Sequence, residues 1–394
     1  MRCAWRIPFA SSAGLDSWHT EGFQIHGRET CQLLQEHLFP VVVTLIPIIL
    51  NPWVQEQHTV HKSRTHRLAD SETAKAYLMQ KKHQKYQRLL DRCSSLPPAT
   101  TAVAHPCDET SLKGAVEAAE LRLLIPILVG PRGRIESVAK QCGIDASRYA
   151  IVDSPHSHAA AEVAVRLVRE GKAEMLMKGS LHTDELLGAV VARETGLRTA
   201  HRISHCFIMD VPSLEQAIII TDAAVNIFPT LEDKVHITQN AIDLAHALGR
   251  SDPKVAILSA METVNPKVQS TIDAAALCKM AERGQISGGI LDGPLALDNA
   301  INLAAAKIKM IESPVAGQAD ILVVPDLEAG NMLAKSLTFL ADADAAGIVL
   351  GARVPIILTS RADSVMTRLA SCAVGALVAK ARRDNASETM GHAA

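Results

Sequence analysis

The chain has 394 residues, of which 48% are apolar and 21% are charged, and its formal net charge is −2. This length fits two or three domains, and the composition excludes wholesale disorder, a collagen-like repeat and a strongly basic nucleic-acid binder. The best candidate for a membrane span, Leu38–Leu50, is interrupted by Pro40 and Pro47 and is shorter than the roughly 18 residues that a membrane helix needs. We therefore expect neither nucleic acid nor a membrane as a partner.

Eight cysteines are scattered along the chain, at positions 3, 31, 93, 107, 142, 206, 278 and 372. No two of them form a CxxC pair, and no spacing of Cys and His is typical of a zinc site. The pattern indicates reduced thiols in a cytoplasmic enzyme, with no metal site.

Residues 1–84 differ in composition from the rest, since they hold all three tryptophans. They show little hydrophobic periodicity before Asp70. The stretch from Asp70 to Leu90 then predicts a helix with Ser71 as its N-cap. We place a domain boundary near residue 84 and assign no role to the segment before it.

From Tyr86 onward, short apolar runs alternate with Ala-rich helices such as residues 159–170. The runs predict strands at residues 125–129, 150–153, 173–177, 217–221, 254–258, 320–324 and 355–359. Continuous apolar strands between helices are typical of a parallel sheet that is covered on both faces. Ligands of such α/β folds bind where loops leave the carboxyl ends of strands. The candidate residues should therefore follow these strands.

The segment Lys178-Gly-Ser-Leu-His-Thr183 follows the third predicted strand and precedes a helix that begins near Asp184. Gly179 permits a close backbone approach, Ser180 and Thr183 supply hydroxyls, and a helix N-terminus favours an anion. The alternative is a capped helix start with a solvated lysine. Neither GxxxxGK[ST] nor GxGxxG is present, which excludes a P-loop and argues against an ordinary dinucleotide site.

The last predicted strand ends in Thr359-Ser-Arg-Ala-Asp-Ser364. The guanidinium of Arg361 suits bidentate recognition of phosphate, and the carboxylate of Asp363 could accept a proton. Taken alone, this short pattern is a weak signal.

Several segments, in order along the chain, resemble the phosphate acetyl/butyryltransferase family: residues 178–187, 196–199, 202–205, 221–226, 292–298, 313–320, 325–335 and 351–361. The resemblance extends from about Tyr86 to Arg382. It is greatest to the phosphate acetyltransferase part of bifunctional enoyl-CoA hydratase/phosphate acetyltransferase proteins. Residues 1–84 do not resemble the hydratase domain of those proteins, so no hydratase activity is expected.

This resemblance implies reversible transfer of an acetyl group between coenzyme A, a substrate and not a cofactor, and inorganic phosphate. It implies an α/β fold of two α/β/α domains around a cleft, similar to isocitrate and isopropylmalate dehydrogenases. The first domain would comprise residues 85–200 with 354–385, the second residues 201–353, and residues 386–394 would form a tail. Family members are similar in forming homodimers through the second domain.

The resemblance also assigns site residues. Ser360 and Arg361 match catalytic positions, and Asp363 is the nearest carboxylate for a general base. The residues that the resemblance assigns to substrate binding are Lys178, Gly179, Ser180, Thr183, Asp298, Asn331 and Lys335. Three positions depart from the family pattern: Thr367 replaces an acidic base, Gly188 replaces an arginine that anchors coenzyme A, and Met310 replaces a glycine.

Three alternatives stay open. Acyl-chain length depends on pocket volume, so a phosphate butyryltransferase is the first. A metal-dependent NAD(P)-linked decarboxylating dehydrogenase is the second, but it needs two aspartates four residues apart, where this chain has Asn331 and Lys335. The third is an inactive paralogue, suggested by Thr367 and Gly188.

Overall fold

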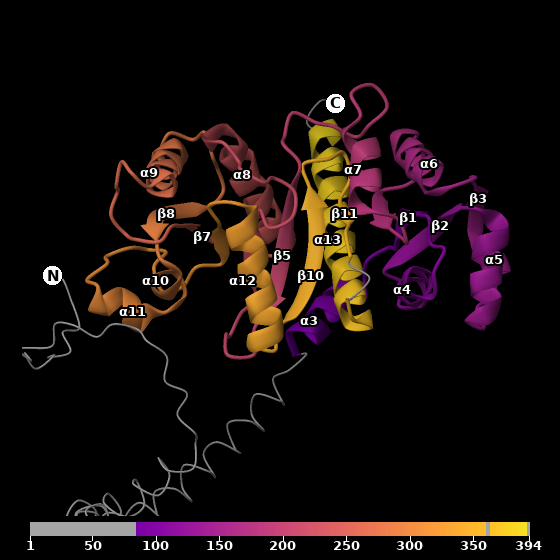
Figure 1. Ribbon diagram of the computed structural model, residues 1–394, viewed down its shortest axis with the longest axis horizontal. Coiled ribbons are helices and arrows are strands. Elements are labelled where there is room, and N and C mark those ends of the chain that lie inside the picture. Colours follow the sequence, from indigo (N-terminus) through magenta and orange to yellow (C-terminus); the bar gives the residue numbers. More distant parts are fainter. Residues whose placement is uncertain (1–83, 360–362, 392–394) are drawn as a thin grey trace, which may run out of the picture. The chain divides into compact units, whose positions relative to one another are not determined.

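The computed structural model describes residues 84–359 and 363–391 (Figure 1). The strands are β1 (Ala99–Ala104), β2 (Leu124–Gly130), β3 (Ala150–Asp153), β4 (Met175–Lys178), β5 (Ser204–Asp210), β6 (Ile218–Thr221), β7 (Lys254–Leu258), β8 (Ile290–Leu295), β9 (Ile321–Val323), β10 (Asp344–Leu350) and β11 (Ile356–Ile357). The helices are α3 (Gln84–Cys93), α4 (Glu109–Glu120), α5 (Arg132–Gln141), α6 (Ser157–Arg169), α7 (Thr183–Val191), α8 (Leu231–Ala247), α9 (Gln269–Glu282), α10 (Leu297–Ile301), α11 (Leu303–Ile308), α12 (Leu327–Leu340) and α13 (Val365–Gly391), with a 3₁₀ turn at Ala146–Arg148.

These elements confirm a mixed α/β architecture. The seven predicted strands are present as β2, β3, β4, β6, β7, β9 and β11. The predicted helix 159–170 is α6, and the helix expected near Asp184 is α7. Of the helix expected from Asp70, only α3 lies within the described residues, and Ser71 lies outside them. The expected tail 386–394 begins inside α13, which continues to Gly391.

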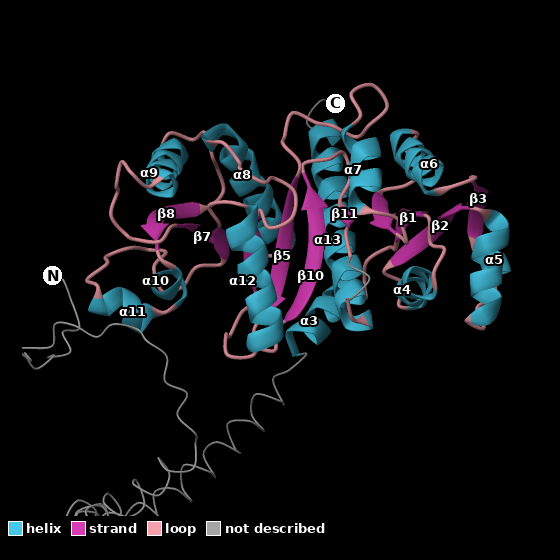
Figure 2. Ribbon diagram, in the orientation of Figure 1, coloured by secondary structure: helices cyan, strands magenta, loops and turns pink. Residues whose placement is uncertain are grey.

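The strands form one sheet in the order β3-β2-β1-β4-β11-β10-β5-β6-β9-β7-β8 (Figure 2). The expectation of an entirely parallel sheet is wrong at its centre, where β10 pairs antiparallel with β11 and β5, and β5 pairs antiparallel with β6. Strand β5 begins with Ser-His and ends with Asp, and β10 begins with Asp, so polar residues bound their apolar stretches. As a result β6, β7, β8 and β9 run opposite to β1–β4, and the two groups have their carboxyl ends at opposite edges.

Helices cover both faces of the sheet, but only one face has a helix that joins the two halves. Residues of α13 belong to two cores: Leu369 and Cys372 pack with residues of β1 and β2, whereas Val374 and Val378 pack with residues of β6, β7 and β9. On the other face, α6 and α7 cover the first half and α10, α11 and α12 the second. No described helix contributes to both cores on that face.

In the described part of the chain, no helix combines the length and apolar character that crossing a membrane requires.

Candidate active site

The carboxyl ends of β4 and β11 lie side by side. The two strands pair in parallel, with Met177 opposite Ile357, so Lys178 and Thr359 follow at the same sheet edge. Lys178 is buried, and its Nζ lies 3.5 Å from the backbone carbonyl oxygen of Thr359. Ser360 and Arg361 come next in the sequence but lie outside the described residues. The structure therefore brings together the two strand ends at which the sequence predicts phosphate-binding residues.

Gly179 allows the ends of β4 and β1 to meet. A Cβ atom at this position would lie 2.3 Å from the carbonyl oxygen of Ala104 and 2.5 Å from that of His105. The Gly179 amide donates to the Ala104 carbonyl (2.9 Å), and the Ser180 amide donates to the His105 carbonyl (2.8 Å). The close backbone approach predicted at Gly179 is present, and any side chain here would push the two strand ends apart.

Ser180 points toward His105, a residue that the sequence analysis did not identify. The Ser180 Oγ lies 2.9 Å from the His105 carbonyl oxygen and 3.2 Å from Nδ1 of its ring, and it accepts from the Cys107 amide at 3.1 Å. His105 was missed because β1, Ala-Thr-Thr-Ala-Val-Ala, lacks the large aliphatic run by which the other strands were found. Histidine tolerates its φ of 55° better than most residues do.

The environment of His105 favours its neutral form. Burial lowers the pKa of His105 below its ordinary value, and Arg134 adds to this effect, whereas a hydrogen bond to the Ser180 backbone and the charges of Glu185 and Asp108 oppose it. A neutral imidazole has one nitrogen free to accept a proton.

Helix α7 begins directly after this segment. Thr183 is its first residue, and the N-cap residue His182 makes no side-chain capping hydrogen bond. Glu185 in the first turn has one carboxylate oxygen 3.5 Å from Nε2 of His158, and its other oxygen is buried without a hydrogen-bond partner. Gly188 is exposed within the same helix, and a Cβ there would meet open space.

Asp363 is half-buried and lies just before α13, whose start is capped by Ser364. The Thr367 amide donates to the Ser364 Oγ at 3.1 Å, and the two hydroxyls lie 3.0 Å apart. A serine N-cap that binds the amide three residues later is a common stabilising arrangement. Thr367, where the resemblance implies an acidic residue, is thus part of the helix start.

Asn331 and Lys335 lie one turn apart on α12, in the second half. Asn331 Nδ2 donates to the carbonyl oxygen of Ala223 at 3.3 Å, and Lys335 is exposed. The neighbouring carboxylate of Asp222 is buried and accepts from the backbone amides of four residues: His205, Ala224, Val225 and Asn226.

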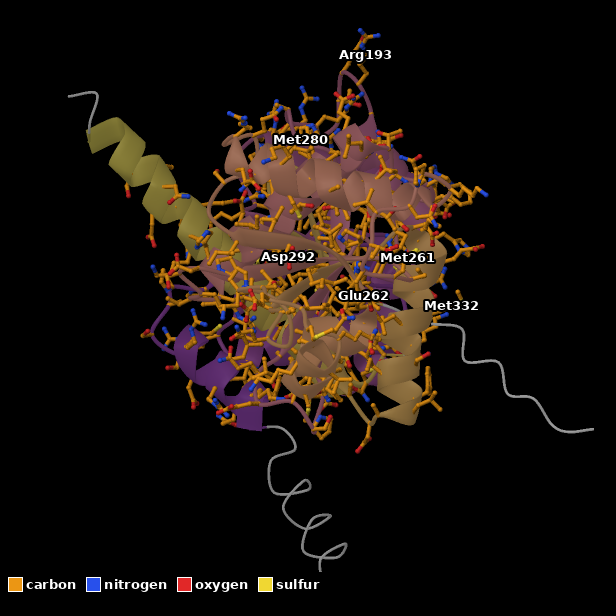
Figure 3. The ribbon with its side chains drawn as sticks, turned by 90° about the vertical axis from the view of Figure 1, so that its left-hand side faces the viewer. Arg193, Met261, Glu262, Met280, Asp292 and Met332 are labelled. Atoms are coloured by element: carbon orange, nitrogen blue, oxygen red, sulfur yellow. The ribbon has the colours of Figure 1, made fainter. Side chains whose placement is uncertain are left out.

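Asp298 lies in a different cluster, after β8 at the far end of the sheet order from β4. Lys309 Nζ lies 3.2 Å from Asp298 Oδ2 and 2.5 Å from Glu262 Oε1 (Figure 3, which labels Glu262). The hydrogen bond from Lys309 lowers the pKa of Asp298. The structure therefore does not bring Asp298 together with Lys178.

Metal-ligating side chains do not cluster in the described ranges: no group of three or more His, Cys, Asp or Glu residues there could hold a metal ion.

The model of the family described as "Phosphate acetyl/butaryl transferase" matches residues 155–376, more than half of the chain. The chain belongs to the phosphate acetyl/butyryltransferase family. It is 67% identical over 299 residues to a phosphate acetyltransferase of Rhizobium meliloti, covering 76% of this chain and 95% of that protein. It is 44% identical over 294 residues to a phosphate butyryltransferase of Clostridium beijerinckii, covering 75% and 97%.

Membership of the phosphate acetyl/butyryltransferase family agrees with the fold. A crystal structure of a branched-chain phosphotransacylase from Enterococcus faecalis superposes with a TM-score of 0.63 at 30% identity, covering 71% of this chain and 99% of that one. The family expected from the motifs between residues 178 and 361 is confirmed.

Proposed function

We propose that this protein is a phosphate acetyltransferase, which converts acetyl-CoA and inorganic phosphate reversibly into acetyl phosphate and CoA. The observation that supports the proposal is the approach of Lys178 to Thr359, a buried cation at the strand end that Ser360 and Arg361 follow in the sequence. The similarity to the Rhizobium meliloti enzyme supports the acetyl group in particular.

In this proposal the phosphate is held by Arg361, whose guanidinium can form two parallel hydrogen bonds, together with Lys178 and Thr183. The Gly179 and Ser180 amides are already bonded to the Ala104 and His105 carbonyls, so these two residues contribute chiefly by shaping the loop. Ser360 donates to the reacting carbonyl oxygen, where negative charge develops.

The thiol of CoA must lose its proton before it can attack acetyl phosphate, because the thiolate is the nucleophile. Asp363 takes this proton in the proposal. Asn331 and Lys335 on α12 are proposed contacts to CoA. A substrate contact by Asp298 stays a prediction, since its carboxylate is paired with Lys309.

The proposed domains are residues 85–200 with 354–385 and residues 201–353, arranged as two α/β/α units around a cleft as in isocitrate dehydrogenase. A homodimer through the second unit is proposed as well. It is supported by exposed apolar side chains on α12, namely Met332, Phe339 and Leu340. A cytoplasmic location is proposed from the cysteine pattern, and the six described cysteines are free.

The test is release of free CoA from acetyl-, propionyl- and butyryl-CoA on addition of phosphate, with no metal and no nicotinamide present. We expect acetyl-CoA to give the highest kcat/KM. A preference for butyryl-CoA would replace the proposal by a butyryltransferase, and no release from any of the three would contradict acyl transfer to phosphate.

Exhaustive dialysis against EDTA separates this function from a metal-dependent dehydrogenase. We expect turnover to be undiminished after dialysis. Loss of activity that Mg²⁺ or Mn²⁺ restores would contradict the proposed mechanism.

A further inference from the structure

The ring of His105 is held at the carboxyl end of β1, next to the loop proposed to bind phosphate. Ala104 pairs with Lys178 across β1 and β4, so His105 follows at the level of Gly179 and Ser180. Its backbone is anchored by the amides of Ser180 (2.8 Å) and Cys107 (2.9 Å), which both donate to its carbonyl oxygen. The ring therefore sits at the sheet edge that Lys178 also reaches.

The contacts of Ser180 indicate which ring nitrogen carries the proton. A hydroxyl has one hydrogen to donate and two lone pairs to accept with. The Ser180 Oγ is closer to the His105 carbonyl oxygen (2.9 Å) than to Nδ1 (3.2 Å), and it accepts from the Cys107 amide. If the hydroxyl donates to the carbonyl, as these distances favour, its remaining lone pair takes the hydrogen of Nδ1. Nε2 is then the unprotonated nitrogen.

The charges around His105 come from four elements. Arg134 on α5 and the adjacent Lys178 of β4 are cations, whereas Asp108 at the start of α4 and Glu185 on α7 are anions. Burial is the largest influence, and it keeps the pKa of His105 below its ordinary value. The ring is thus neutral at neutral pH, as a proton acceptor must be.

We propose that His105 accepts the proton of monohydrogen phosphate through Nε2 while Ser180 fixes its tautomer. This assignment rests on the proposed function and adds a group on the phosphate side, whereas Asp363 serves the thiol side. When a phosphate oxygen attacks the thioester, a C–O bond forms to the carbonyl carbon and the P–O–H proton passes to Nε2. The C–S bond breaks, its electron pair leaves on sulfur, and the thiolate takes a proton from Asp363. Asp363 enters this step as the carboxylic acid, so phosphate loses one proton and the thiol gains one while His105 is left protonated and Asp363 ionised. His105 then releases its proton to solvent and Asp363 takes one up, which resets both groups.

The first measurement needs no turnover. ¹⁵N NMR of the full chain labelled at histidine would report the protonation of both ring nitrogens of His105 at pH 7.5, with its signals assigned by their absence in His105→Asn. We expect Nδ1 to carry the hydrogen and Nε2 to be bare. A hydrogen on Nε2 instead would overturn the proposal whatever the activity of the enzyme.

The second measurement uses acetyl phosphate formation. His105→Asn keeps a donor near the Ser180 hydroxyl and tolerates the positive φ, but it has no atom in place of Nε2. We expect kcat to fall by about 10²- to 10⁴-fold with a small change in the KM of phosphate, and the decline of kcat at acidic pH to disappear. Imidazole should restore part of the activity of His105→Gly, which also suits this backbone.

The matched control is His156→Asn, because His156 caps α6 through its ring and asparagine is an equally good N-cap. It should leave kcat and the pH profile unchanged. If the wild-type protein releases CoA while His105→Asn keeps more than about a third of its kcat and the same acidic decline, His105 is not the acceptor and the transferase function stands. A wild-type protein without phosphate-dependent CoA release would instead overturn the transferase function, and this assignment with it.

Discussion

The ammonium of Lys178 lies 3.5 Å from the backbone carbonyl oxygen of Thr359, a residue 181 positions later in the chain. Because Ser360 and Arg361 follow directly, Lys178→Met should weaken phosphate binding without disturbing the strands, since methionine fills a similar volume. Hydrogen bonds to charged groups contribute about 1.5–3 kcal/mol, so we expect kcat/KM for phosphate to fall roughly 10- to 100-fold. Lys178→Arg is the comparison variant, and it should lose less. Equal kcat/KM in Lys178→Met and wild type would exclude a role in phosphate binding.

Asp363 differs from Lys178 in the step that it should affect. Asp363→Asn should spare phosphate affinity and lower turnover by about 10² to 10⁴ at neutral pH, the usual range for a lost general base. The deficit should shrink as the pH approaches the thiol's own pKa of about 8.5, where the solution already contains thiolate. A pH–rate series with CoA and acetyl phosphate measures both effects. Near-normal turnover of Asp363→Asn at neutral pH would show that another residue accepts the thiol proton.

His205 makes the folded state sensitive to acid. Burial lowers its pKa from 6.5 to about 4, and the nearby Asp222 only partly opposes this shift. The folded protein therefore resists a proton that the unfolded chain binds, so the stability due to the neutral ring is complete above pH 6.5 and is lost as the pH falls from 6.5 to 4. The loss amounts to about 3 kcal/mol.

Replacing His205 with leucine should flatten the dependence of the urea midpoint on pH in this window. The orphaned Nδ1 of the buried ring is lost in this variant, so no new polar group is left unpaired. His158→Asn, at an exposed position, is the control and should follow the wild-type curve. A His205→Leu curve parallel to wild type would show that the ring is not responsible.

Lys234 on α8 and Asp273 on α9 form an ion pair at 2.6 Å, with both side chains only 6–7% exposed. Lys234→Met would leave the buried carboxylate of Asp273 without its ion-pair partner, which should lower the free energy of unfolding by about 3–5 kcal/mol. The double variant Lys234→Met/Asp273→Leu should regain most of this loss, because neither charge then remains. The exposed pair Lys380–Asp384 offers a contrast, since Lys380→Met should cost no more than about 0.5 kcal/mol. Urea unfolding of the wild type, the two single variants and the double variant measures these differences in stability. A double variant no more stable than Lys234→Met would contradict this reasoning.

Met310 stands where the resemblance to the family implies a glycine, and its backbone conformation is one that glycine adopts readily. Its φ is 55°, just after the end of α11, and its side chain is 87% exposed. This conformation destabilises the folded state by about 1–2 kcal/mol for a non-glycine residue. Glycine avoids that strain, but its greater freedom in the unfolded chain costs about 0.5–1 kcal/mol of stability. Met310→Gly should therefore stabilise the fold by about 0.5–1 kcal/mol, seen as a higher urea midpoint. Met310→Ala keeps the strain and should show no gain.

The strands that could be predicted from the sequence are those with an uninterrupted run of apolar residues. Residues 218–220 of β6 and 255–258 of β7 are continuously apolar, as is typical of strands with both faces covered. The strand Ser204–Asp210 begins with Ser-His and ends with Asp, so its pattern resembles a loop as much as a strand. Its antiparallel pairing depends on partners far along the chain, which no local window contains.

The site shows the same division. Residue types around Lys178 and Gly179 were enough to locate a loop that two strand ends share. The direction of the Ser180 hydroxyl was not predictable, because it depends on His105 and Cys107, more than 70 positions earlier. The separation of Asp298 from Lys178 was not predictable for a related reason: the reversal of strand direction at the sheet centre, which no motif reports, puts the carboxyl ends of the two halves at opposite edges.

Helix α13 lies C-terminal to every other described element, yet it supplies Leu369 and Cys372 to one core and Val374 and Val378 to another. Strand β11, which separates β4 from β10, also comes late in the chain. During translation, the strands near the start of the described chain are therefore made long before the residues that cover them. Neither half can complete its core until α13 has left the ribosome, so the two halves should finish folding together, after the rest of the described chain has been made.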